Sequence, residues 1–145
     1  MSLLIKSQAA GQTVVQLPPG ALQYVGFSAY RLKAGETLPV TAGDQELCLV
    51  LLSGRVSIGG EAPEQGAFNW PDIGDRLSVF DDKSPFAAYL PPGSQASVQA
   101  LSDVQIAVCA APGSATAGLG PRLISPQSMK RSVRGKGANT RYVCD

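Results

Sequence analysis

The chain has 145 residues, of which 44% are hydrophobic and 16% are charged. This length predicts one domain with a hydrophobic core, and the composition excludes a disordered chain and a coiled coil. Twelve basic and eleven acidic residues leave a net charge of +1, so no global electrostatic field would hold nucleic acid or an anionic membrane.

The sequence contains no histidine. Histidine is the usual proton carrier near neutral pH and a common zinc or iron ligand. Its absence excludes Ser/His/Asp and Cys/His nucleophilic sites as well as His-based metal centres. We therefore expect no catalytic residue, no cofactor-binding residue and no metal ligand in this chain.

The beginning of the chain and its cysteines bear on the compartment. Residues 1–6 contain only three consecutive apolar residues, too few for a signal peptide or a membrane-spanning helix. Cys48, Cys109 and Cys144 cannot all pair within one chain, and the first two lie in apolar runs typical of buried thiols. These features predict a cytoplasmic protein.

Short β-rich runs separated by glycine and proline dominate the chain up to residue 111, and no helical periodicity extends beyond two turns. The sequence predicts a tight hairpin at Ser53-Gly54 and a loop over residues 59–75. The continuous apolar run 47–52 indicates a strand covered on both faces. The expected strands are residues 13–17, 24–33, 46–58, 76–80, 86–90, 96–101 and 104–111.

This pattern is typical of an all-β sandwich or barrel. We assign residues 1–112 to a single barrel without metal ligands. Residues 113–145 contain many Gly, Ser, Pro and basic residues, which predicts a mostly irregular C-terminal extension or linker.

The spacing of the turns resembles the cupin family, whose members are double-sheet β-barrels of the jelly-roll type. The first cupin motif begins and ends with glycine, at the spacing of Gly35 and Gly54. The second motif contains a Pro-x-Gly, which matches Pro91 and Gly93. An unrelated β-sandwich is the alternative to this resemblance.

The metal-ligand positions of these motifs carry residues that cannot bind a metal. The cupin pattern places Thr41 and Gly43 at its two histidines, Leu47 at its glutamate and Ala96 at its fourth ligand. Glu46 lies one residue from the glutamate position. A shift by one residue moves a strand side chain to the opposite face, so we expect Glu46 to point away from the site.

Longer stretches are similar to a narrower family. Six blocks in the same order resemble the amino-terminal half of 5-deoxy-glucuronate isomerases: residues 24–36, 43–58, 74–94, 103–113, 122–126 and 134–143. Members of this family are two-cupin enzymes of inositol breakdown. The resemblance implies the aldose–ketose isomerisation of 5-deoxy-glucuronate to 5-keto-2-deoxy-gluconate. That reaction moves a proton between adjacent carbons while a divalent ion polarises the carbonyl.

In that family, histidines and a glutamate of the carboxy-terminal cupin hold the metal, and this sequence lacks that half. The resemblance therefore implies no catalytic or metal residue here and leaves open whether the chain alone is an enzyme. It implies either a fragment of the isomerase or a short gene for the metal-free half, and we favour the fragment. The expected partners are the second cupin half or further copies of the chain, without nucleic acid or membrane.

Two alternatives stand beside this prediction. One is a stand-alone, metal-free cupin that binds a sugar acid or a protein partner without catalysis. The other is an enzyme that uses carboxylates alone, drawn from an acidic cluster near Arg76. The cluster consists of Asp72, Asp75, Asp81 and Asp82. We favour loop ion pairs and turn-stabilising aspartates as its interpretation.

The tail carries five basic residues within twelve positions, with Tyr142 as the one aromatic residue beside them: Lys130, Arg131, Arg134, Lys136 and Arg141. One interpretation is a patch for phosphate, carboxylate or nucleic acid. We favour a solvated arm that docks against an acidic neighbour, because single-strand platforms need more aromatic residues.

Two groups of aromatic residues also invite interpretation. Phe68 and Trp70 have the rings to stack on a sugar, but we expect them to pack against the barrel. Tyr24, Phe27 and Tyr30 fall within one expected strand, where Tyr24 and Tyr30 share a face and Phe27 takes the other. Packing accounts for all of them without a ligand.

Overall fold

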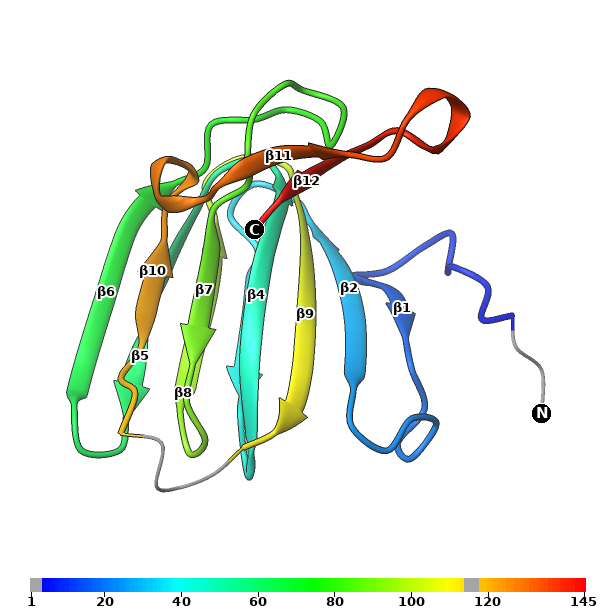
Figure 1. Cartoon of the computed structure of the whole chain (residues 1–145). Coiled ribbons are helices and arrows are strands. Elements are labelled where there is room, and N and C mark those ends of the chain that lie inside the picture. The colour runs from blue at the N-terminus through cyan, green and yellow to red at the C-terminus, as the bar shows by residue number, and fades with distance from the viewer. Residues whose placement is uncertain (1–3, 114–117) are drawn as a thin grey trace.

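The protein has the all-β architecture that the sequence predicts. A computed structural model describes residues 4–113 and 118–145. In this part of the chain, ten strands form two antiparallel sheets of six and four strands, and two more strands form a separate pair (Figure 1). The two sheets enclose the core of a jelly-roll barrel.

The six-stranded sheet has the order β1 (Thr13–Gln16), β2 (Gly26–Leu32), β9 (Val104–Pro112), β4 (Gln45–Ser53), β7 (Ala87–Leu90) and β10 (Arg122–Ile124). The four-stranded sheet has the order β3 (Thr37–Thr41), β8 (Gln95–Ala100), β5 (Val56–Ala62) and β6 (Gly66–Ile73). The separate pair is β11 (Arg131–Arg134) and β12 (Arg141–Cys144), and single 3-10 turns cover Pro126–Ser128 and Gly137–Asn139. Among the described residues, no helix is long and apolar enough to cross a membrane.

Most connections carry the chain from one sheet to the other. From β2 to β5, and again from β6 to β9, every successive strand lies in the opposite sheet. The hairpin predicted at Ser53-Gly54 is therefore wrong, because β4 and β5 belong to different sheets. Gly54 does make a sharp bend: its φ is 89° and its N–H donates to the carbonyl oxygen of Arg76 at 2.9 Å.

Gly54 provides a test of this crossing. A Cβ added there would lie 2.2 Å from the carbonyl oxygen of Asp103, whereas a Cβ at Gly35, with a similar φ of 87°, would meet nothing within 4 Å. Both Gly54→Ala and Gly35→Ala place a Cβ on a left-handed backbone, which is unfavourable. We expect Gly54→Ala to lower the free energy of unfolding in urea by about 1–3 kcal/mol more than Gly35→Ala. Equal losses would contradict the close approach of the two turns.

Two strands were not predicted from the sequence, because they depend on packing between distant segments. Residues 59–75, expected to be a loop, contain the end of β5 and all of β6. Phe68 and Trp70 alternate with exposed residues along β6 and pack against the core. The pattern of β-rich runs in the sequence also does not predict β3. Pro39 is tolerated in this strand because β3 lies at the edge of its sheet.

The strand predicted over residues 76–80 is instead an irregular loop. The Asp81 carboxylate accepts hydrogen bonds from the backbone N–H groups of Leu77 at 2.7 Å and Ser78 at 3.3 Å. A side chain that satisfies neighbouring backbone donors stabilises a turn in place of a strand ladder.

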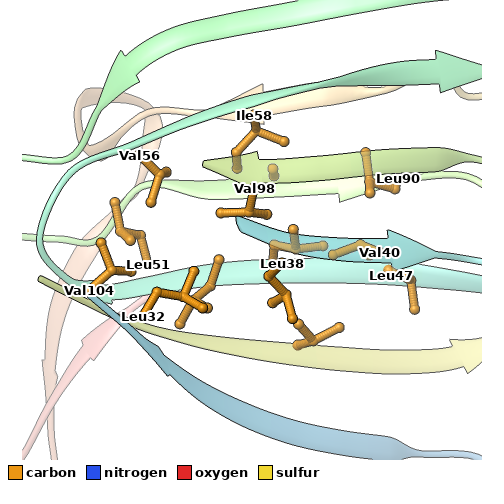
Figure 2. Close-up of a cluster of buried hydrophobic side chains, with 14 of the residues drawn as sticks. Leu32, Leu38, Val40, Leu47, Leu51, Val56, Ile58, Leu90, Val98 and Val104 are labelled. Atoms are coloured by element: carbon orange, nitrogen blue, oxygen red, sulfur yellow. The ribbon is translucent and has the colours of Figure 1, made fainter. Parts of the chain in front are cut away.

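The hydrophobic core lies between the two sheets (Figure 2). Along β4, the alternate residues Leu47, Leu49 and Leu51 are at most 5% exposed, and the residues between them are half-buried. The apolar run 47–52 is thus fully covered on its inward face only. Its outward face lies on the outer surface of the six-stranded sheet.

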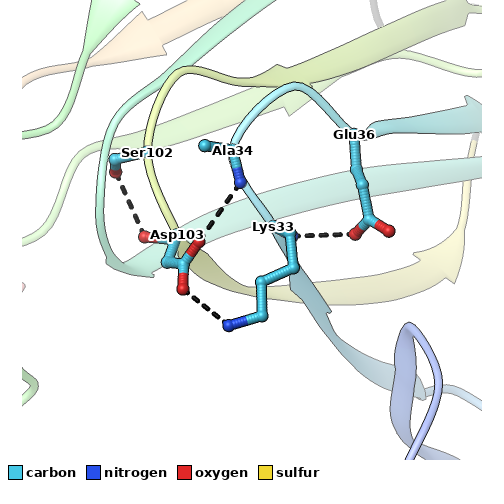
Figure 3. A network of polar contacts seen from close by, with 5 residues as sticks. All are labelled: Lys33, Ala34, Glu36, Ser102 and Asp103. Atoms are coloured by element: carbon cyan, nitrogen blue, oxygen red, sulfur yellow. Dashed lines mark hydrogen bonds and ion pairs between the residues drawn. The ribbon is translucent and has the colours of Figure 1, made fainter.

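A polar network joins the turns at one end of the barrel (Figure 3). Lys33, after β2, contacts Asp103, before β9, with 2.7 Å between Nζ and Oδ2. Asp103 also accepts the Ala34 N–H at 3.2 Å. These hydrogen bonds hold the pKa of Asp103 below its usual value. Because both charged groups are exposed, the network orients the turns and stabilises the fold only weakly.

The C-terminal part is attached to the barrel. β10 extends the six-stranded sheet through β7, while β11 and β12 lie across one end of the barrel (Figure 1). There Arg131 forms an ion pair with Asp82, and the Ser84 hydroxyl lies 3.4 Å from the Cys144 sulfur. The expected extension therefore contains short strands that contact the loop between β6 and β7.

Candidate functional site

The strand register decides which residues occupy the cupin metal positions. On β3, Leu38 and Val40 are buried and Thr41 is exposed. The next residue, Ala42, is again buried at 3% exposure. Val40 and Ala42 therefore point into the barrel, whereas Thr41, which the motif spacing places at the first histidine position, points outward. Motif spacing counts residues and carries no information about the face of a strand.

The other two ligand positions are placed as the sequence predicts. Leu47 on β4 is 5% exposed and belongs to the core. Ala96 on β8 is the register partner of Val40 and packs against the same core. All four inward side chains are hydrocarbon, so they offer no nitrogen, oxygen or sulfur to a metal. They do not fit the divalent ion that the family resemblance implies for the active cupin.

The described residues offer no second group of side chains that could bind a metal. Residues 4–113 and 118–145 contain no group of three or more His, Cys, Asp or Glu that could hold an ion. Glu46 lies on the outer face of the sheet, as expected, where its Oε2 accepts the Tyr89 hydroxyl at 3.1 Å. Burial, together with this carboxylate, raises the pKa of Tyr89. This pair lies on the opposite side of β4 from the barrel interior.

Each member of the acidic cluster has its own hydrogen-bond or ion-pair partner. Asp72 on β6 forms a two-point ion pair with Arg55, at 2.8 and 2.6 Å. Asp75 lies 3.5 Å from the Lys83 ammonium. Asp81 stabilises its own turn, as described above, and Asp82 pairs with the tail. These contacts match the interpretation as ion pairs and turn residues.

Arg76, at the centre of that sequence cluster, has a different role. Its side chain is 9% exposed. It donates to three backbone carbonyls: from Nε to Leu52 at 2.8 Å, and from its terminal nitrogens to Lys83 at 3.2 Å and Leu51 at 3.3 Å. Its hydrogen bonds thus join the end of β4 to the loop between β6 and β7. A lone arginine among aspartates gives no sequence signal for such a role.

A cavity of about 420 Å³ opens at the end of the barrel where β2 begins. Its described wall contains hydroxyl, amide and apolar groups and no charged side chain. The wall includes both Tyr24 and Tyr30, the two tyrosines predicted to share a face. Tyr24 lies before β2 and is 67% exposed, while Tyr30 packs against the core. Phe27 lies between them on the exposed side of the strand.

The remaining candidates have structural contacts. Phe68 and Trp70 contact each other with ring centroids 4.8 Å apart, in agreement with packing against the barrel. Cys48 and Cys109 are register partners on β4 and β9, half-buried and free. Burial, with a smaller effect of Cys109, raises the pKa of Cys48, which lowers its thiolate fraction and its reactivity.

The five basic residues of the tail are all exposed. Two of them have acidic partners in the described chain: Arg131 pairs with Asp82, and Arg134 lies 2.6 Å from Asp145. Of these two ion pairs, only that of Arg131 with Asp82 joins the tail to the barrel, since Asp145 belongs to the tail itself. Tyr142 is 82% exposed and is the register partner of Val133.

Fold and site together define a cupin-type barrel whose metal positions are apolar. The fold is shared with an oxalate decarboxylase variant from Bacillus subtilis, at a TM-score of 0.56 and 17% identity over 76% of this chain and 28% of that chain. Residues 3–145 match the KduI/IolB family. The chain belongs to this family.

Relatives in the family define the match further. The 5-deoxy-glucuronate isomerase of Geobacillus kaustophilus (strain HTA426) is 37% identical over 97% of this chain and 50% of its own length. That of Geobacillus thermodenitrificans (strain NG80-2) is 40% identical over 90% and 46%. An IolB-like protein from Salmonella typhimurium LT2 has a TM-score of 0.88 and 35% identity over 99% of this chain and 53% of that chain. The chain therefore spans about half the length of the curated relatives it matches, and its resemblance to one half of these isomerases is confirmed.

Proposed function

We propose that this chain is the metal-free, non-catalytic half of a 5-deoxy-glucuronate isomerase of inositol breakdown, and that a second cupin half carries the metal and the reaction. The observation that carries this proposal is the apolar filling of the inward cupin positions Val40, Ala42, Leu47 and Ala96. Hydrocarbon side chains can neither polarise a carbonyl nor transfer a proton. The names of the matching relatives support the substrate. A cytoplasmic location is part of the proposal, because all three cysteines are free thiols.

An activity measurement tests the proposal. The purified chain is expected to isomerise 5-deoxy-glucuronate no faster than buffer, with or without added Mn²⁺ or Zn²⁺, while the full-length Geobacillus kaustophilus relative serves as the positive control. Turnover that a chelator abolishes would contradict the metal-free assignment. Turnover that survives the chelator and is lost in Asp72→Asn or Asp75→Asn would favour the carboxylate enzyme instead.

The mechanical role has its own experiment. A chimera in which this chain replaces the matching half of the Geobacillus kaustophilus relative is expected to retain isomerase activity, because the proposed role needs only the barrel and its packing surface. A folded chimera without activity would contradict this role.

An exposed apolar loop supports a proposal for the position of the contact with the second half. Leu77 is 89% exposed and Phe80 is 93% exposed, with the half-exposed Val79 between them. Large apolar side chains gathered at one loop are typical of a surface that another protein covers. Arg76 anchors this loop on one side and the pairing of Asp82 with the tail holds it on the other. We place the contact with the second cupin half on this loop, and with it the self-association of the isolated chain.

Sedimentation equilibrium checks the position of this surface. The isolated chain is expected to form dimers or larger species at high concentration, and the double variant Leu77→Ser/Phe80→Ser is expected to sediment as a monomer. Leu119→Ser, which changes another exposed leucine (61%), is the matched control and should leave association unchanged. A monomeric parent chain, or equal association of the double variant, would contradict the assignment.

A further inference from the structure

We propose that the cavity at the beginning of β2 binds a neutral, polyhydroxylated small molecule of monosaccharide size. Its volume of about 420 Å³ lies within the roughly 300–1,000 Å³ of small-molecule sites, and the mouth of a β-barrel is a common place for them. This inference goes beyond the proposed function and does not rest on it, because it concerns binding without catalysis.

The cavity wall presents hydrogen-bonding groups that have no partner in the described protein. Ser28 and Tyr30 share the face of β2 that continues to the buried Leu32. Gln16 on β1 is the register partner of Ser28, and Gln45 begins β4 at the same opening. The side chains of Gln16, Ser28, Tyr30 and Gln45 form no hydrogen bond with another described residue. Hydroxyl and amide groups both donate and accept, as the hydroxyls of a polyol require.

Apolar surfaces complete the wall. Leu38 and Val108 line the cavity from the core side. Tyr24 also lines it and is accessible, at 67% exposure. Aromatic rings combine a large apolar surface with a polar end in tyrosine. A sugar ring matches this combination, since its C–H groups pack on rings while its hydroxyls reach the polar wall.

The absence of charged side chains in the described cavity wall distinguishes neutral sugars from sugar acids. No described residue that lines the cavity is Lys, Arg, Asp or Glu. A carboxylate moved into such a site would lose hydration without gaining a cationic partner. The geometry therefore favours a neutral sugar or polyol over the sugar acid considered from the sequence.

A matched pair of ligands tests this inference. We expect D-glucose and sorbitol, added to the isotope-labelled chain, to shift amide NMR signals of β2 and of residues 17–25 in a saturable manner. D-glucuronate, which differs from glucose by its carboxylate, is expected to bind at least about tenfold more weakly, as the loss of a desolvated charge requires. The proposal is overturned if neither neutral probe gives saturable shifts, if the shifts map elsewhere, or if glucuronate binds as tightly as glucose.

Two variants locate the site. Tyr30→Phe removes one hydroxyl from the wall and is expected to weaken glucose binding roughly two- to tenfold, the effect of one lost hydrogen bond. Tyr89→Phe removes a hydroxyl from the outer face of the same sheet and should leave binding unchanged. Ser28→Leu is expected to fill the cavity and abolish binding. If this variant does not fold, the comparison of glucose affinity between Tyr30→Phe and Tyr89→Phe tests the position of the site. Equal affinity of the two phenylalanine variants would overturn the assignment.

Discussion

Val40→Asp is expected to lower the free energy of unfolding by at least about 4 kcal/mol, whereas Thr41→Asp is expected to change it by less than about 1 kcal/mol. The two residues are neighbours on β3 but face opposite directions. Val40 is 8% exposed and belongs to the core, while Thr41 is exposed. A carboxylate at position 40 would lose its hydration inside the barrel, and one at position 41 would stay in water.

Urea unfolding checks this pair, with the fluorescence of the single tryptophan, Trp70, as the signal. Val40→Thr serves as a milder variant if Val40→Asp does not fold, with an expected loss of about 1–2 kcal/mol from the buried hydroxyl. A larger loss in Thr41→Asp than in Val40→Asp would show that Thr41 faces the interior. The motif frame read from the sequence would then be correct.

The second large effect is expected at Arg76. Arg76→Ala would leave the carbonyl oxygens of Leu51, Leu52 and Lys83 without their donor. Unpartnered backbone groups that stay shielded from water are costly. We expect a loss of about 3 kcal/mol in the free energy of unfolding, reduced from the full sum because the loop can open to water. Arg76→Lys should recover only part of it, since a single ammonium cannot reproduce the planar fork.

Arg55→Ala is the matched control, because Arg55 also follows β4 but forms an exposed ion pair with Asp72. Its expected loss is less than about 1 kcal/mol. Limited proteolysis adds a local measurement: Arg76→Ala should be cleaved within residues 77–82 faster than the parent chain. Equal stability losses in Arg76→Ala and Arg55→Ala would contradict the anchoring role.

Each of the two predictions tests a different part of the proposed function. The Val40 pair tests whether the inward cupin positions are filled by hydrocarbon, on which the non-catalytic role depends. The Arg76 variants test the support of the loop that carries Leu77 and Phe80. If this loop is the packing surface, Arg76→Ala should also weaken the self-association of the isolated chain.

Much of the candidate site followed from sequence. The absence of histidine excluded the common metal and nucleophile sets, and the Gly and Pro spacing predicted a cupin barrel. Leu47 and Ala96 were correctly placed inside, and Glu46 outside, because a period of two within one strand determines the face once a single residue is anchored. The blocks of family resemblance also identified the matching half of longer isomerases.

Tertiary structure decided what depends on partners distant in the chain. Ser53-Gly54 has the local signal of a hairpin, yet β4 and β5 pair with different strands. β3 and β6 contain prolines that are compatible with strands at the edges of the sheet, and Arg76 gains its role only from carbonyls of β4 and of the loop before β7. Local propensity determines whether a segment extends, but pairing and burial depend on contacts between segments far apart in sequence. For this protein, the sequence by itself determined the fold class and the family resemblance, and only the assembled sheets determined the faces, the cavity and the exposed loop.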